Sequence, residues 1–128
     1  MKYLLDTHLL IWALCEPERL SSKVRDIVLD DRNDLYFSAA SLWELTIKQA
    51  QARLDFLVAP HILYQTLISK GYIELPVSSL HTLAVGALSP IHKDPFDRIL
   101  IAQAQVEGIT LLTCDERMAQ YGGMVLKV

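Results

Sequence analysis

Lys2-Tyr3-Leu4-Leu5-Asp6 is a short apolar run that ends in a carboxylate, and a longer apolar stretch, Leu9 to Leu14, follows it. The short run predicts a β-strand and the longer stretch predicts a buried helix. The same order recurs along the chain, and we expect strands at residues 2–5, 35–38, 72–75, 110–113 and 125–128. Strands that alternate with helices predict right-handed crossovers and a mainly parallel sheet of four or five short strands, with helices on both faces.

Turn residues and caps place the helices between these strands. Pro17 ends the first helix, and Gly71 and Gly108 end two later ones, because glycine adopts the left-handed conformation that closes a helix. We expect helices at residues 9–14, 23–30, 42–52, 59–69, 80–88, 94–107 and 116–121. The predicted fold class is therefore α/β.

Composition limits the class of protein. The 128 residues are expected to form one domain, 1–128, and an apolar fraction of 52% leaves apolar surface for a partner. The longest apolar stretch, Leu9 to Cys15, is too short to cross a bilayer, and Met1-Lys2 leads straight into a strand, so we expect a cytoplasmic protein without a signal peptide. The net charge of -3 argues against broad binding to a phosphate backbone, but it allows contact through a bound metal ion.

Four acidic residues, Asp6, Glu44, Asp97 and Asp115, follow an apolar strand-like run or begin the helix after it. Strand ends and helix starts meet at one edge of an open parallel sheet, where such folds place their sites. Carboxylates gathered at that edge repel one another unless a cation lies between them. Divalent cations such as Mg²⁺ prefer several carboxylate oxygens and promote hydrolysis of phosphate esters. The pattern therefore predicts a metal site suited to phosphate chemistry.

Each acid also has a purely structural interpretation. Ser41-Leu42-Trp43-Glu44 has the pattern of a capping box, and Asp94-Pro95-Phe96-Asp97 has that of a helix start. Asp6 and Asp115 are placed to cap helices, where the helix dipole favours negative charge. Ser or Thr serves equally well as a cap and already stands beside three of the acids. The coincidence of four acids therefore favours the metal site.

Four blocks of sequence carry these acids in order: Leu4-Leu5-Asp6-Thr7-His8, residues 38–44 (SAASLWE), residues 94–104 (DPFDRILIAQA) and Leu112-Thr113-Cys114-Asp115. They resemble the ordered blocks of PIN-domain proteins, above all those of VapC-type toxins from bacterial toxin–antitoxin pairs. The most specific block is Asp94-Pro95-Phe96-Asp97-Arg98. The resemblance covers nearly the whole chain and implies a PIN-like three-layer α/β/α domain.

The resemblance also implies a Mg²⁺- or Mn²⁺-dependent endoribonuclease that hydrolyses RNA with a metal-activated water. By motif position, the catalytic and metal-binding acids would be Asp6, Glu44, Asp97 and Asp115. Supporting roles would fall to Thr7, Ser38 and Thr113, with Asp94 as an additional acid that we interpret mainly as a helix cap. The implied partners are RNA, a VapB-like antitoxin and a second copy of the chain, and no membrane is expected.

Other polar and aromatic residues have two interpretations each. Lys48 is placed to pair with Glu44 one helical turn away or to contact substrate phosphate, and Arg98 is a candidate for a phosphate or partner contact. His92 and Lys93 lie in a loop at the expected mouth of the site. We expect His8 to face away from the acids, Trp12 and Trp43 to lie in the core, and Cys15 and Cys114 to be reduced thiols without a nucleophilic role.

Two other functions remain open from the residues. An acid-nucleophile phosphatase or phosphoacceptor domain would use Asp6, although such domains normally carry a second acid close by, and here Thr7 and His8 follow instead. A non-catalytic interaction module would use the acids only as helix caps. Trapping of an aspartyl-phosphate would favour the first, and failure to bind Mn²⁺ would favour the second.

Overall fold

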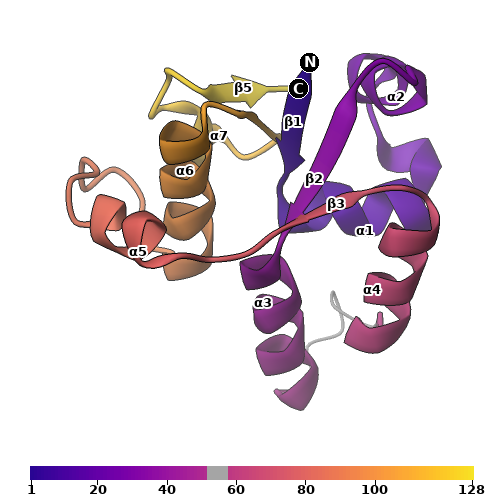
Figure 1. The fold of residues 1–128 in the computed structure, drawn as a ribbon, viewed down its shortest axis with the longest axis horizontal. Helices are drawn as coiled ribbons and strands as arrows, with labels where there is room; N and C mark the ends of the chain where they lie inside the picture. Colours follow the sequence, from indigo (N-terminus) through magenta and orange to yellow (C-terminus); the bar gives the residue numbers. More distant parts are fainter. Residues whose placement is uncertain (52–57) are drawn as a thin grey trace.

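A five-stranded, wholly parallel sheet forms the centre of the computed structural model, which describes residues 1–51 and 58–128 (Figure 1). The strand order is β3-β2-β1-β4-β5, and all four pairs are parallel. The strands are β1 (Lys2–Leu5), β2 (Asp34–Ser38), β3 (Ile73–Leu75), β4 (Thr110–Thr113) and β5 (Val125–Lys127). The predicted parallel sheet is thus confirmed, with all five strands within one residue of the expected bounds.

Alternating side chains of the central strands enter two separate cores. Leu5 and Leu112 are fully buried on one face of the sheet, whereas Leu4 and Leu111 are fully buried on the other. Successive residues of a strand point to opposite faces, so a strand buried on both faces is apolar at every position. This is why Leu4-Leu5 of β1 and Leu111-Leu112 of β4 are consecutive apolar residues in the sequence.

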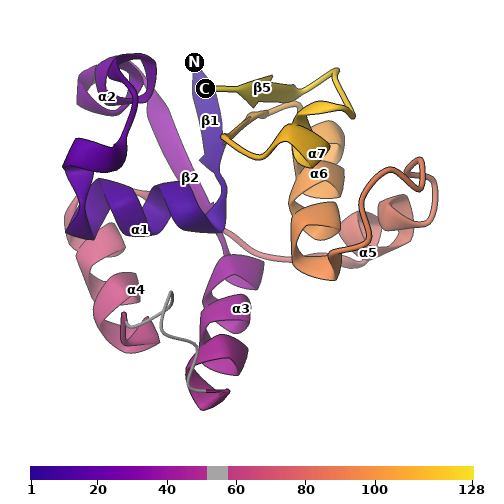
Figure 2. The same ribbon diagram turned by 180° about the vertical axis from the view of Figure 1, so that it is seen from behind.

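Helices cover both faces of the sheet (Figures 1 and 2). The core that contains Leu5 is completed by residues of α1, α2 and α4, and the core that contains Leu4 is completed mainly by α6. The helical segments are α1 (Thr7–Cys15), the short 3₁₀ helix η1 (Pro17–Arg19), α2 (Ser22–Leu29), α3 (Ala39–Ala50), α4 (Pro60–Ser69), α5 (Ser79–Val85), α6 (Pro95–Glu107) and α7 (Glu116–Ala119). No helix among residues 1–51 and 58–128 is long and apolar enough to span a bilayer.

The main difference from the predicted helices lies at the start of α3. We expected this helix to begin at Leu42, but it begins at Ala39, because the Ser38 hydroxyl caps it by accepting a hydrogen bond from the Ala40 amide at 3.0 Å. The expected end at Ala52 lies outside the described residues. The predicted stop at Gly108 is confirmed, since this glycine has φ +67° directly after α6.

Candidate functional site

A cavity of about 390 Å³ lies at the edge of the sheet where β1 and β4 end. All four predicted acids line it, although they belong to separate elements of the chain. Of the other predicted site residues, Thr7, Asp94 and Lys48 also line the cavity. The full lining consists of Asp6, Thr7, His8, Trp12, Glu44, Lys48, His92, Asp94, Asp97, Cys114, Asp115 and Met118.

Asp6 is both a helix cap and a buried member of the cavity. Its Oδ1 accepts a hydrogen bond from the Leu9 amide at 3.0 Å at the start of α1, and its Oδ2 accepts one from the Thr113 hydroxyl at 2.5 Å. Burial raises the pKa of Asp6 above its ordinary value, and the nearby charge of Asp115 raises it further. The two hydrogen bonds oppose this rise, so Thr113 stabilises the charged form of Asp6.

Glu44 lies within α3, not at its cap. The predicted capping box is wrong, because Ser38 caps the helix and Ser41 lies inside it. Glu44 Oε1 instead accepts a hydrogen bond from the Thr7 hydroxyl at 2.8 Å, and that hydroxyl lies 2.9 Å from the Ser41 hydroxyl. Glu44 is 4% exposed, and a buried polar side chain is costly without such hydrogen bonds.

Asp97 faces the cavity from the first turn of α6. Asp94 caps this helix as expected, because its Oδ1 accepts hydrogen bonds from the Phe96 and Asp97 amides at 2.9 and 3.1 Å. The pKa of Asp97 is raised to about 7, chiefly by burial and also by the charges of Asp94, Glu44 and Asp6, against a hydrogen bond with His92. The surroundings therefore disfavour the charged form of Asp97 when no cation is present.

Asp115 completes the acidic lining from the start of α7. Its Oδ1 accepts hydrogen bonds from the Arg117 and Met118 amides at 2.7 and 3.2 Å, so it also caps a helix. Potential ligand atoms of His92, Asp97 and Asp115 all lie within 4.8 Å of one another.

The lining fits a divalent cation in both charge and donor type. Most of its donors are carboxylate oxygens, which suit Mg²⁺ or Mn²⁺. A carboxylate has about four lone-pair sites, so the cap hydrogen bonds of Asp6 and Asp115 leave acceptor capacity for a metal ion. The raised pKa values of Asp6 and Asp97 show that the surrounding protein compensates their charge incompletely.

The two predicted substrate-binding residues differ in position. Lys48 lines the cavity and pairs with Glu44, with 2.9 Å between Nζ and Oε2. The phosphate contact proposed for Arg98 is not supported, because its guanidinium donates to the carbonyl oxygens of Ser89, His92 and Val85 and to the Tyr121 hydroxyl. Arg98 therefore stabilises a loop and is not part of the cavity lining.

Ser38 and Thr113 do not line the cavity, but their hydroxyls make hydrogen bonds close to it. Ser38 is fully buried and acts through the start of α3, whereas Thr113 acts directly on Asp6 and also accepts a hydrogen bond from the Asp115 amide at 3.0 Å. Both hydroxyls thus fix the backbone or carboxylates of the acids without lining the cavity themselves.

His8 and Trp43 are placed differently from expectation, whereas His92 lies at the cavity as expected. His8 lines the cavity and does not face away from it, and its ring centroid lies 6.0 Å from that of Trp12. Trp43 is 61% exposed and not in the core, and its ring packs against that of Phe96 in a T-shaped arrangement. His92 is nine-tenths buried beside Asp97, although loop residues are usually solvated. Its only sequence signal was its position five residues before Asp97.

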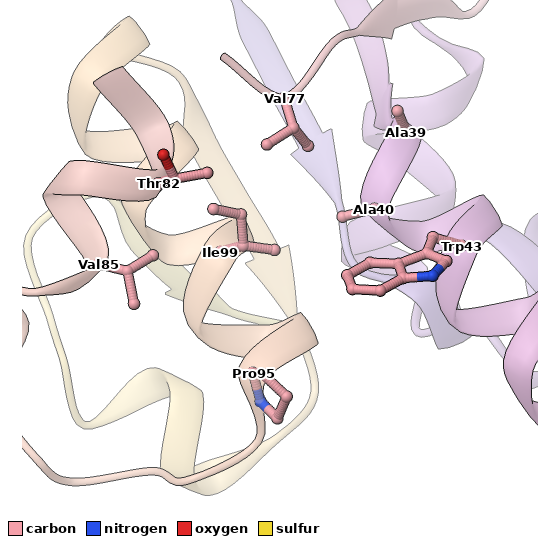
Figure 3. A pocket seen from close by; sticks show the side chains of 8 residues that line it. All are labelled: Ala39, Ala40, Trp43, Val77, Thr82, Val85, Pro95 and Ile99. Atoms are coloured by element: carbon pink, nitrogen blue, oxygen red, sulfur yellow. The ribbon is translucent and has the colours of Figure 1, made fainter. Parts of the chain in front are cut away.

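A second cavity, of about 460 Å³, is apolar and lies among α3, α5 and α6 (Figure 3). Figure 3 shows the side chains of Trp43, Val77, Val85 and Ile99 around it. The rest of its lining is Ala39, Ala40, Thr82 and Pro95. This cavity is apolar whereas the other is acidic, although residues of α3 and of the start of α6 line both.

Fold and site together define the class of protein: the chain belongs to the PIN-domain family, whose model matches residues 3–124. The predicted family resemblance is thereby confirmed. Among individual proteins, the chain is similar to "Ribonuclease VapC22" of Mycobacterium tuberculosis, with 29% identity over 118 residues that cover 92% of this chain and 90% of the relative.

Solved structures show the same fold. VapBC2 from Rickettsia felis, bound to a DNA fragment from its promoter, matches with a TM-score of 0.72 and 17% identity over 100% of this chain and 98% of the other. DNA-bound VapBC from Salmonella typhimurium matches with a TM-score of 0.71 and 18% identity over 99% of this chain and 98% of the other.

Proposed function

We propose that this protein is a metal-dependent endoribonuclease and the toxin component of a toxin–antitoxin pair. The observation that carries the proposal is the convergence of Asp6, Glu44, Asp97 and Asp115 on one cavity from separate elements of the chain. The similarity to a relative named as a ribonuclease supports the reaction class.

The four acids would hold Mg²⁺ or Mn²⁺, which supplies Lewis acidity and lowers the pKa of water for phosphodiester hydrolysis. Thr113 and Thr7 hold the carboxylates of Asp6 and Glu44 in place through hydrogen bonds of 2.5 and 2.8 Å. Lys48 places positive charge at the wall of the cavity, where it is suited to contact a phosphate of the RNA.

Cleavage of RNA in the presence and absence of divalent metal tests this function. We expect purified protein to cut single-stranded RNA with Mg²⁺ or Mn²⁺ and to lose this activity in EDTA, because the carboxylates alone offer no Lewis acid. Gel electrophoresis of labelled RNA measures the cleavage. Activity that persists in EDTA would exclude a metal-dependent mechanism.

Both other functions are weaker explanations of the geometry. A phosphoacceptor role for Asp6 conflicts with its 4% exposure. A capping role explains Asp6, Asp94 and Asp115 but not Glu44, which lies inside α3. Binding of Mn²⁺ to the wild-type protein separates the proposed function from the capping module.

A VapB-like antitoxin is the partner that the family resemblance suggests. Its C-terminal segment would reach the acidic cavity, where an arginine would pair with the carboxylates through charge-assisted hydrogen bonds. We expect expression of the protein alone to arrest growth and co-expression with the adjacent gene to restore it, with the two products forming an inactive complex. Colony counts and co-purification measure these effects. Harmless expression alone would contradict the toxin role.

A second copy of this chain is the proposed occupant of the apolar cavity in Figure 3. Two apolar side chains at or beside this cavity are exposed: Trp43, which lines it, is 61% exposed, and Leu83, which follows the lining residue Thr82 in α5, is 75% exposed. Exposed apolar surface of this kind favours burial against a partner. We expect a homodimer by light scattering and a monomer for Leu83→Glu. Leu29→Glu is the matched control, since Leu29 is 73% exposed on α2. A dimer that survives Leu83→Glu would contradict this interface.

A further inference from the structure

Hydrogen bonds to Arg98, in α6, and to Tyr121, in the turn after α7, hold the loop that contains His92 in place. The guanidinium of Arg98, in α6, donates hydrogen bonds of 3.1 Å to the carbonyl oxygens of Ser89 and His92 and one of 3.0 Å to the Tyr121 hydroxyl. That hydroxyl accepts a hydrogen bond from the His92 amide at 3.0 Å and donates one to the Ser89 carbonyl at 2.8 Å. The backbone on both sides of the His92 side chain is therefore fixed.

The imidazole of His92 points into the acidic cavity and is only partly satisfied. Its Nε2 lies 2.7 Å from Asp97 Oδ2, and its side chain is 10% exposed. Its Nδ1 is buried without a hydrogen-bond partner among the described residues. A buried polar atom without a partner is costly, and a bound ion is one of its recognised explanations.

We propose that a ring nitrogen of His92 joins Asp97 and Asp115 as a ligand of the divalent cation, so that the site is not built from acids alone. The inference rests on the proposed function, because it concerns the same metal ion. Potential ligand atoms of the three residues lie within 4.8 Å of one another, and neutral imidazole is the commonest side-chain metal ligand.

A nitrogen ligand has a consequence for metal preference. Mg²⁺ favours oxygen ligands and retains its waters, whereas imidazole binds first-row transition metals more strongly. His92 should therefore increase the affinity for Mn²⁺ and affect that for Mg²⁺ little. A histidine that only orients Asp97 would affect the affinities for both ions to a similar degree, because Asp97 would bind either of them.

Pulsed electron paramagnetic resonance of bound Mn²⁺ tests the ligand directly, in protein without a polyhistidine tag. We expect nitrogen hyperfine coupling in the wild type, its loss in His92→Gln and its retention in His8→Gln, since His8 lines the same cavity. We also expect His92→Gln to weaken Mn²⁺ binding at least about tenfold. Loss of a residue that only orients a metal ligand weakens metal binding roughly 10- to 100-fold, and loss of a ligand should cost no less. Titration with Mn²⁺ and Mg²⁺ measures both affinities.

Wild-type protein grown with isotopically labelled histidine keeps the test valid if His92→Gln does not fold, because the label alters the coupling pattern of a histidine ligand. Bound Mn²⁺ without nitrogen coupling, or coupling that survives His92→Gln, overturns the inference and leaves the proposed function standing. No binding of Mn²⁺ by the wild type overturns both. Asp97→Asn should abolish tight binding of both Mn²⁺ and Mg²⁺, because its carboxylate would bind either ion. This result separates the contribution of the acids from that of His92.

Discussion

Asp97→Asn is expected to reduce metal-dependent RNA cleavage by at least about 100-fold. Loss of a residue that only orients a metal ligand costs up to about 100-fold, and Asp97 is a proposed ligand itself. The substitution keeps the shape of the side chain and removes one negative charge from the cavity. Asp6→Asn should have a comparable effect, and its asparagine can still cap α1. Initial cleavage rates at saturating Mn²⁺ measure both losses.

Asp26→Asn is the matched control for these variants, because Asp26 lies on the exposed surface of α2 and does not line the acidic cavity. It should cleave RNA at the wild-type rate. Full activity of Asp97→Asn and Asp6→Asn would refute the assignment of the four acids, while leaving the fold and family membership intact.

Metal-free protein should become more stable through the same Asp97→Asn change, most strongly near neutral pH. The pKa of Asp97 is raised from its ordinary 3.8 to about 7 in the folded protein. Between these values the folded state binds more protons than the unfolded state, so the free energy of unfolding falls as pH rises. Asparagine does not titrate, and the variant therefore escapes this loss.

Melting temperatures in EDTA at about pH 4 and about pH 7 measure the difference between the two proteins. We expect the variant to melt about 4 °C or more above the wild type at the higher pH, which corresponds to about 1 kcal/mol in a small domain. The difference should shrink toward the lower pH. Added Mn²⁺ should raise the melting temperature of the wild type more than that of the variant, because it binds the native site.

A purely structural role for Asp97 predicts the opposite sign. A carboxylate in the first turn of α6 interacts favourably with the helix dipole, so its loss would destabilise the protein at neutral pH. A lower melting temperature for metal-free Asp97→Asn at about pH 7 would thus favour the helix-start interpretation. Asp26→Asn controls for the general effect of removing one negative charge.

Strands were predictable from the sequence because burial on both faces makes them continuous apolar runs, as in β1 and β4. The start of α3 was not. Ser38 and Ser41 are both acceptable caps, and local pattern favoured Ser41 because Glu44 stands three residues after it. The structure selects Ser38, which ends β2 and turns the chain directly into the helix.

Site residues on strand ends and helix starts were predictable because a parallel sheet gathers these positions at one edge. Contacts made by loops were not predictable, because the direction of a loop side chain depends on tertiary partners. Arg98 stands beside Asp97 in sequence yet bonds loop carbonyls, and His92 reaches the cavity only because Arg98 and Tyr121 fix its backbone.

The hydrogen bond between Asp6 and Thr113 joins residues 107 positions apart. During translation, the first acid of the cavity therefore leaves the ribosome long before the hydroxyl that holds it in place and before Asp115. Tyr121, which fixes the His92 loop, is made later still. A nascent chain has no assembled cavity until its synthesis is nearly complete, so prematurely terminated products would be harmless to the RNA around them.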